Sequence, residues 1–357
     1  MTWKRLKNHK STNFNKALAK PLTYCVLGGK EEGKSTLLEG IACRYQGCIL
    51  DLFGARDGEG LGWLRSPLYD GKNQFLLLKS PSVEVECPLA DIKNVTDVRL
   101  SDFDKYRVII SPSFFYKNIH QEWYYIGKLI EKLWLREHWT QPSCIIIREA
   151  SNLIASRQTL GDTQRQAIDQ FTYFAREIRH SGFAVCLDTL RWKGIEINIR
   201  SLSDYLFLKA VGIQGVPPEL KFVFKTFPRF ADYLTMRVNH FVIISRQGSI
   251  GAGKFGLPSW HKREHENFRQ IFNIRVKYKD MPFIPTIQQG KVGDPEHIGI
   301  IKAYIETGIG QVKLSEKIHR SSRTINKHIN YHNNMIHTVG ECDKCARLNA
   351  KYKKTLT

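Results

Sequence analysis

The sequence lacks long apolar runs and has few cysteines. No stretch approaches the roughly 18 consecutive apolar residues of a membrane-spanning helix, and no apolar segment follows the basic N-terminal residues as it would in a secretory signal. Of eight cysteines in 357 residues, only Cys342 and Cys345 stand at a metal-ligand spacing, which does not indicate a disulfide framework. These absences predict a cytoplasmic protein without a membrane span.

Acidic residues are also scarce. The chain has 34 Asp and Glu against 54 Lys and Arg, which gives a formal net charge of +20. An excess of this size favours a polyanionic partner, either nucleic acid or an anionic membrane surface. Residues 1–20 contain basic residues and no acid, so we expect a flexible basic arm there.

Between residues 21 and 260 short apolar runs alternate with amphipathic helical patterns. This alternation predicts an α/β domain with a mostly parallel sheet. The helices are expected over 119–138 and 162–180. The strands are expected at Leu22–Leu27, Cys48–Asp51, Phe75–Leu78, Arg107–Ser111, Ser143–Ile147, Phe183–Asp188, Tyr205–Leu208 and His240–Arg246. Residues 261–293 are rich in loop-forming residues and are expected to form a linker to a C-terminal domain over 294–357.

A phosphate-binding motif follows the first predicted strand. Residues 28–36, Gly-Gly-Lys-Glu-Glu-Gly-Lys-Ser-Thr, match the P-loop pattern G-x-x-x-x-G-K-[ST], and a helical pattern follows. Glycines let successive backbone N–H groups converge on phosphate oxygens, and a helix N-terminus adds a positive dipole end. The nucleotide-binding residues are expected to be Gly28, Gly29, Gly33, Lys34, Ser35 and Thr36. Lys34 would reach the β- and γ-phosphates of ATP, and Ser35 would ligate Mg²⁺.

Residues 248–254 repeat the glycine spacing of this motif. They lack the Ser or Thr that would bind Mg²⁺, and Pro258 follows within a turn. No helix is predicted there, so we expect no second nucleotide site.

An ATPase of this kind also needs an acid at the end of a neighbouring strand. The apolar run Ser143–Ile147 leads to Glu149, which we expect to be the general base for the attacking water. The usual pattern at this place is Asp-Glu, and Arg148 stands where the first acid would be. The metal-positioning role is then unfilled, or it falls to Asp51 or Asp188 at other strand ends. Asp188 and Thr189 are also candidates for sensing the γ-phosphate.

The C-terminal segment 294–333 has the spacing of a small α-helical (winged) helix-turn-helix domain. Three helices are expected, with Ile301, Ile305, Leu314, Ile318, Ile325 and Ile329 as the core. The third helix would contact DNA through Ser322, Arg323, Thr324, Asn326 and Lys327. A helical protein-binding or oligomerisation module is the alternative.

The pair Cys342 and Cys345 lies beyond these helices. Together with His328 and His332, which share a helix face, it would complete a tetrahedral Zn²⁺ site, although His337 is an equally available ligand. Reduced cysteines without metal are the other interpretation.

Taken in order, the motifs at 28–36, 147–150, 175–183, 184–189 and 199–207 resemble those of the HerA/FtsK superfamily of DNA-pumping P-loop ATPases, which includes viral genome-packaging enzymes. The resemblance covers about residues 22–260. It implies a hexameric ring with DNA in the channel and an arginine donated to the γ-phosphate, for which Arg176, Arg179 and Arg200 are candidates. The family's strand-end polar residue is typically Gln, so Asp188-Thr189 departs from it.

The sequence therefore predicts an ATP-hydrolysing, DNA-stimulated motor on double-stranded DNA that forms a homo-oligomer. A P-loop switch or initiator that loads onto DNA is the alternative, and a DNA-binding regulator that binds nucleotide without turnover is a third possibility because of Arg148.

Overall fold

The chain divides into two units, Met1–Met281 and Pro282–Thr357. The computed structural model describes residues 2–4, 20–53, 58–68, 71, 74–155, 162–211, 215–280, 283, 300, 303–304, 307–308, 310–326 and 329.

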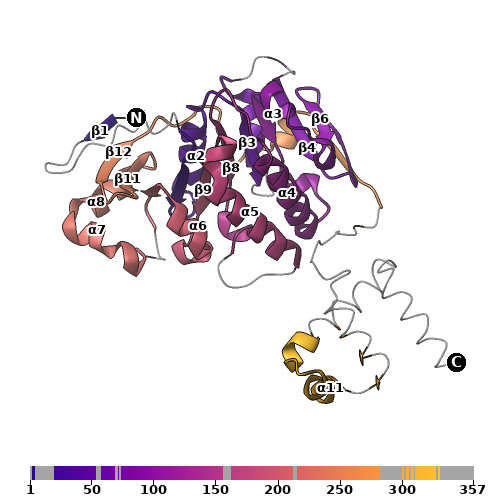
Figure 1. Ribbon diagram of the computed structural model, residues 1–357. Coiled ribbons are helices and arrows are strands. Elements are labelled where there is room, and N and C mark those ends of the chain that lie inside the picture. The colour runs from indigo at the N-terminus through magenta and orange to yellow at the C-terminus, as the bar shows by residue number, and fades with distance from the viewer. Residues whose placement is uncertain are drawn as a thin grey trace. The chain divides into compact units, whose positions relative to one another are not determined.

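The first unit is built on one large sheet (Figure 1). Its strand order is β1-β12-β11-β10-β2-β9-β8-β3-β7-β4-β6, and a separate two-stranded sheet pairs β13 with β5. The strands are β1 (Thr2–Lys4), β2 (Thr23–Leu27), β3 (Ile49–Phe53), β4 (Phe75–Lys79), β5 (Val83–Glu86), β6 (Asp91–Asn94), β7 (Val108–Ile110), β8 (Ser143–Ile147), β9 (Phe183–Thr189), β10 (Tyr205–Leu208), β11 (His240–Ser245), β12 (Ile250–Lys254) and β13 (Arg275–Tyr278).

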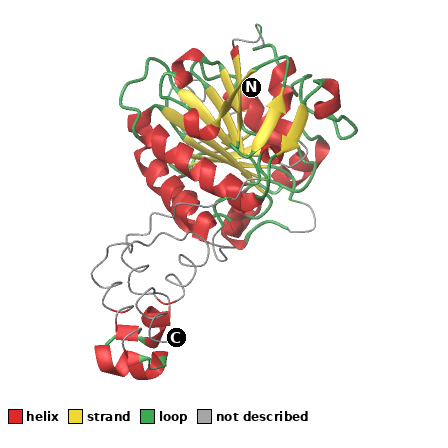
Figure 2. Cartoon of the chain, turned by 90° about the vertical axis from the view of Figure 1, so that its right-hand side faces the viewer, coloured by secondary structure: helices red, strands yellow, loops and turns green. Residues whose placement is uncertain are grey.

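Helices cover the sheet on both faces, as Figure 2 shows for the yellow strands and red helices. The α-helices are α2 (Lys34–Ala42), α3 (Asp102–Lys105), α4 (Ile119–Trp134), α5 (Asp162–Ser181), α6 (Ile197–Leu202), α7 (Lys221–Thr226), α8 (Arg229–Met236), α9 (Phe268–Ile271) and α11 (Gln311–Ile318). The short 3₁₀ helices are η1 (Glu59–Arg65), η3 (Val95–Asp97), η4 (Ser113–Phe115), η5 (Ala150–Asn152), η6 (Trp192–Gly194) and η8 (Pro218–Leu220). Among the described helices none is both long and apolar enough to cross a bilayer.

The eight strands from β10 to β6 in this order run parallel to one another. Parallel strands covered on both faces are expected to be apolar throughout, and every residue of β2, β8 and β9 is buried. Because their carboxyl ends meet at one edge, the residues that follow β2, β8 and β9 lie together there. Strand β9 lies between the other two and brings Asp188 between the loop after β2 and the turn after β8.

Helices α4 and α5 pack against each other. Asn118, the residue before α4, caps this helix, because its side chain accepts a hydrogen bond from the backbone N–H of Gln121 at 3.0 Å. Gly127 allows the close approach, since a Cβ at this position would lie 3.2 Å from the Cα of Ala167 on α5. Both long helices were expected from their apolar periodicity.

Three segments differ from their predicted arm, loop or linker structure. Within the predicted flexible arm 1–20, residues 2–4 form β1, which pairs with β12. Residues 250–254 form β12, which pairs with β11, so the glycine-rich motif at 248–254 has no helix N-terminus. The predicted linker 261–293 contains α9 and β13 in its described part, and β13 pairs with β5. The reason is apolar burial, because Trp260, Phe268 and Phe272 pack into the main core.

The second unit has its own small core among the described residues. Ile300, Leu314, Ile325 and Ile329 are buried against one another, with Ile318 packed beside them. Of the predicted core residues, Leu314, Ile318, Ile325 and Ile329 thus come together, whereas Ile301 and Ile305 lie outside the described residues. Helix α11 matches the predicted second helix, and residues 322–326 are helical.

Candidate functional site

The loop between β2 and α2 has the backbone conformation of a phosphate-binding turn. Glu31 and Gly33 both have positive φ, at 63° and 72°, and α2 starts at the next residue, Lys34. Gly33 also approaches the chain closely, because a Cβ there would lie 2.9 Å from the carbonyl oxygen of Val238. The Lys34 side chain is buried, and its ammonium group donates a hydrogen bond to the carbonyl oxygen of Gly29 at 2.6 Å.

Asp188 joins this loop to the end of β8. One of its carboxylate oxygens accepts a hydrogen bond from the Ser35 hydroxyl at 3.4 Å, and the other accepts one from the backbone N–H of Glu149. Burial raises the pKa of Asp188 to about 7 against the opposing effect of Lys34, and Glu149 and Glu59 raise it further. A carboxyl group beside the Ser35 hydroxyl is a hard oxygen donor of the kind that Mg²⁺ prefers.

Glu149 is held in an unusual backbone conformation. Its φ is 47°, in the left-handed region, at the point where β8 ends and η5 begins. Such a conformation costs a β-carbon-bearing residue of order 1 kcal/mol and is often found at functional sites. The side chain is half-buried and faces the cavity beside the loop 28–36.

Arg148 lies at the centre of a buried cluster of ion pairs. Its guanidinium is buried and pairs with Glu39 on α2 at 2.8 Å, with Asp51 on β3 at 2.7 Å and with Glu59 on η1 at 3.2 Å. These three carboxylates hold the pKa of Arg148 well above its usual value despite the burial of the group. Asp51 also accepts a hydrogen bond from the indole of Trp63. Of the two alternative acids that the sequence offers, Asp188 therefore contacts Ser35, whereas Asp51 is engaged by Arg148 and Trp63.

A cavity of about 770 Å³ lies over the loop 28–36. This volume is within the usual range for small-molecule sites. One wall comes from Lys34, Ser35 and Thr36, and a second comes from Glu59 and Glu149. The remaining wall is the segment 257–264, together with Val238. Sequence reasoning missed Glu59 and the segment 257–264, because no motif marks them, and the segment 257–264 also lies far along the chain from the loop 28–36.

Arg65 fixes the segment 257–264 in place. Its guanidinium donates hydrogen bonds to the backbone carbonyls of Trp260 and His261, both at 2.7 Å. It also makes a two-pronged ion pair with Glu266 at 2.7 Å, which lowers the pKa of that carboxyl to about 2. Arg65 therefore ties Trp260 and His261 to η1, the element that also carries Glu59.

Two of the three predicted arginine candidates, Arg176 and Arg200, lie away from this cavity. Arg176 is exposed on α5, and Arg200 on α6 is half-buried with its guanidinium 5.6 Å from the Trp192 ring. Neither lines the cavity, whereas Arg263 does. The side chain of Arg179 lies outside the described residues.

The predicted C-terminal sites are only partly described. Ser322, Arg323 and Asn326 are exposed, and Thr324 is half-buried. Lys327 and the predicted zinc ligands His328, His332, Cys342 and Cys345 lie outside the described residues.

The fold and the site define a mostly parallel α/β protein whose residues 28–36 have the sequence and local conformation of a P-loop. No family model matches the chain, and no curated protein is similar to it in sequence.

The chain is similar to solved structures at low identity. The genome packaging NTPase B204 from Sulfolobus turreted icosahedral virus 2, solved in complex with sulfate, is 15% identical over 67% of this chain and 98% of that one, with a TM-score of 0.41. The same NTPase in complex with ATP-gammaS is 17% identical over 66% and 98%, with a TM-score of 0.37. The pCW3 conjugation coupling protein TcpA is 10% identical over 67% of this chain and 61% of that one, with a TM-score of 0.39. These similarities are too distant to assign a function.

Proposed function

We propose that this protein is a P-loop ATPase that acts on double-stranded DNA. The ATPase part of the proposal rests on the contact of Asp188 with both Ser35 and Glu149. Ser35 and Glu149 line the same cavity as Lys34. This contact brings together, from three separate strand ends, the groups that phosphoryl transfer requires.

Each residue has a distinct role in this proposal. Lys34 exchanges its hydrogen bond with the Gly29 carbonyl for one to the β- and γ-phosphates. Ser35 and Asp188 would hold Mg²⁺, which would supply positive charge to neutralise the phosphates. Glu149 accepts the proton of the attacking water, and its position is fixed because its own N–H binds Asp188.

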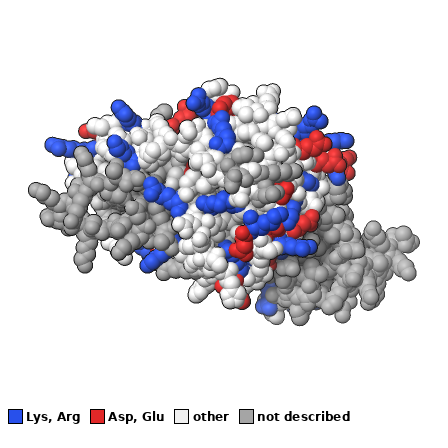
Figure 3. Space-filling view, turned by 90° about the horizontal axis from the view of Figure 1, so that it is seen from above, with Lys and Arg blue, Asp and Glu red and all other residues white. Residues whose placement is uncertain are grey.

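The nucleic-acid part rests on charge and on the helices of the second unit. The net charge of +20 favours a polyanion, and lysine and arginine side chains are spread over the face seen in Figure 3, with acidic side chains in a few groups among them. The exposed Ser322, Arg323 and Asn326 suit contacts with phosphates and base edges. We propose a motor that assembles as a homo-oligomer, in keeping with the resemblance to hexameric DNA pumps.

A nucleotide-dependent switch on DNA is the second candidate. Arg148 favours it, because this residue occupies the place of an acid in the resembling ATPases and ties Asp51 into a buried ion pair. The motor displaces a protein block from duplex DNA in an ATP-dependent assay, and the switch does not.

The ATPase proposal is tested by measuring ATP turnover with and without duplex DNA. Lys34→Ala should abolish turnover while leaving the fold intact. Lys254→Ala is the control, because the Lys254 side chain is exposed on β12 and does not line the cavity. Unchanged turnover in Lys34→Ala would overturn the assignment of the site.

The DNA proposal is tested by deleting residues 291–357. Lysines and arginines that displace counterions from DNA are then lost, so DNA affinity should fall and its dependence on salt should flatten. ATP binding should remain. Equal affinity and an equal salt slope after the deletion would assign the module to protein contacts.

A further inference from the structure

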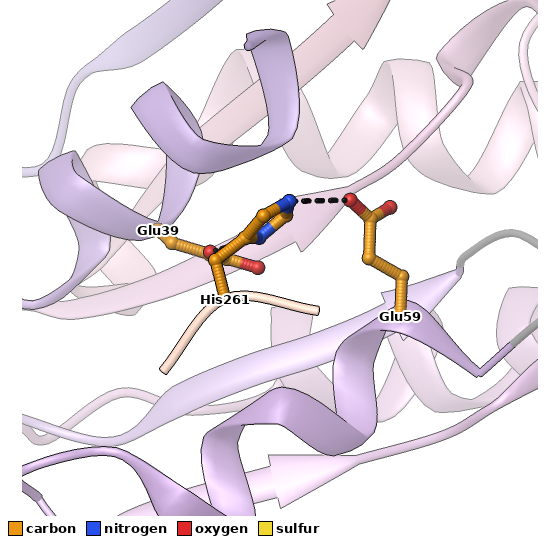
Figure 4. Close-up of side chains that lie close together, drawn as sticks. All are labelled: Glu39, Glu59 and His261. Atoms are coloured by element: carbon orange, nitrogen blue, oxygen red, sulfur yellow. Dashed lines mark hydrogen bonds and ion pairs between the residues drawn. The ribbon is translucent and has the colours of Figure 1, made fainter. Parts of the chain in front are cut away.

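Three side chains from distant segments meet at the rim of the cavity (Figure 4). His261 places its Nδ1 2.8 Å from a carboxylate oxygen of Glu39 on α2, and its Nε2 3.5 Å from an oxygen of Glu59 on η1. One donor atom from each residue lies within 4.8 Å of the other two. Glu39 is buried, and the side chains of Glu59 and His261 are 17% and 23% exposed.

These donors have the chemistry of a metal site. An imidazole nitrogen with two carboxylate oxygens is a ligand set for a divalent transition-metal ion, which binds such atoms at about 2.0–2.2 Å. A tetrahedral ion with such bonds keeps its ligand atoms roughly 3.4 Å apart. The two distances from the His261 ring involve different nitrogens, and an imidazole binds one ion through one nitrogen. The three ligand atoms lie within 4.8 Å of one another, so binding requires the carboxylate on the far side of the ring to move toward the nitrogen that binds the ion.

The charges around the three residues favour a divalent cation. Glu39, Asp51 and Glu59 surround one guanidinium, that of Arg148, so three negative charges face one positive charge in a region that is largely closed to water. Buried charge is costly unless it is paired. A protonated His261 would offset one of the two remaining negative charges, whereas a divalent ion bound to neutral His261 offsets both.

We propose that Glu39, Glu59 and His261 bind one divalent transition-metal ion, with Zn²⁺ as the ion that suits the mixed nitrogen and oxygen ligands. Three protein ligands leave a fourth position open. Since Glu59 and His261 line the cavity over the loop 28–36, that position faces the cavity. The ion also joins the segment 257–264 to the helix that follows this loop. The site is distinct from the Mg²⁺ position at Ser35 and does not depend on ATP hydrolysis.

The test is Zn²⁺ binding to the full chain without nucleotide, measured by competition with a chromophoric chelator. Cys342→Ser and Cys345→Ser are included throughout, so that the predicted C-terminal ligands do not contribute. We expect one Zn²⁺ per chain, bound at least tenfold more weakly after His261→Asn or Glu59→Gln. Co²⁺ in place of Zn²⁺ should give a visible absorption band of a tetrahedral ion, and His261→Asn should remove it.

His265→Asn is the matched control, because His265 lies four residues further along the chain with an exposed side chain. It should leave both the Zn²⁺ affinity and the Co²⁺ band unchanged, and circular dichroism should report the same fold for every variant. Equal affinities in the His261 and His265 variants would overturn the proposal. Absence of Zn²⁺ binding would also overturn it, and His261 would then be an ion-pair partner of both glutamates. Lys34→Ala should bind Zn²⁺ normally. Failure of the Zn²⁺ proposal can therefore be distinguished from failure of the ATPase proposal.

Discussion

Asp188 is the residue whose ionisation the fold controls most directly at the candidate site. Burial raises its pKa from 3.8 to about 7. A carboxyl group with a higher pKa in the folded than in the unfolded chain stabilises the fold in its protonated form. That contribution is complete below about pH 4 and is lost as pH rises through 7, at about 1.4 kcal/mol per pH unit.

Asp188→Asn should therefore remove a pH dependence of stability. Between pH 5 and 7, the free energy of unfolding of the wild type should fall relative to that of the variant, by about 1.4 kcal/mol per unit. The measurement is urea unfolding, followed by tryptophan fluorescence, in buffer without nucleotide or divalent cations. Parallel profiles for the two chains would mean that Asp188 is ionised in the folded protein throughout this range.

Glu149 is the residue to which we assign water activation. Glu149→Gln keeps the shape of the side chain and the backbone hydrogen bond to Asp188 but removes the base. ATP should still bind, and the rate of hydrolysis should fall by a factor of roughly 10²–10⁴. Single-turnover kinetics measures this directly. Glu264→Gln is the control, since Glu264 lines the same cavity but is exposed on the segment 257–264. If hydrolysis survives in Glu149→Gln, Asp188 becomes the candidate base.

At the scale of secondary-structure elements, the buried ion-pair cluster around Arg148 connects four segments of the fold. It joins the turn after β8 to α2, β3 and η1. Arg148→Met should destabilise the protein by about 3–5 kcal/mol, because three carboxylates lose their buried partner. Arg275→Met is the control. Arg275 pairs with Glu86 across β13 and β5 at 3.7 Å, with both side chains 75% exposed, and its loss should cost no more than about 0.5 kcal/mol. Similar urea midpoints for the two variants would contradict a structural role for the cluster.

The elements that sequence could predict are those with an apolar signature of their own. The predicted strands that became β2, β8 and β9 are short runs of apolar residues that are buried on both faces, so composition alone marks them. Strands β12 and β13 have no such continuous run of apolar residues. They are held by pairing with β11 and β5 and by packing of distant aromatic residues such as Trp260 and Phe268, which local pattern does not reveal.

The same distinction applies to the candidate site. Gly33, Lys34 and Ser35 belong to one short motif whose spacing encodes its geometry. The choice between Asp51 and Asp188 required the strand order, because only β9 lies between β2 and β8. Glu59 and His261 contact each other although they are 202 positions apart in the sequence, and only the folded chain brings them together.

At the scale of the whole molecule, the question is whether the cavity is complete within one chain. Charge on the γ-phosphate grows in the transition state of phosphoryl transfer, and an arginine there is worth a factor of about 10³–10⁵ in rate. Neither Arg176 nor Arg200 lines the cavity of its own chain, so either would have to act on a neighbouring subunit. Arg263 lines the cavity and would act within the chain.

Mixing experiments separate these two arrangements. If Arg176 or Arg200 acts between subunits, ATP turnover per chain should rise steeply with protein concentration. Adding the corresponding Arg→Ala chain to wild type should also depress turnover more than dilution does, because mixed rings contain defective neighbours. Arg263→Ala provides the contrast, since an arginine acting within its own chain lowers turnover only in proportion to the fraction of variant. Turnover strictly proportional to concentration in a confirmed monomer would exclude the ring motor, and because the nucleotide cavity needs no neighbour, the DNA-bound switch would then be the favoured function.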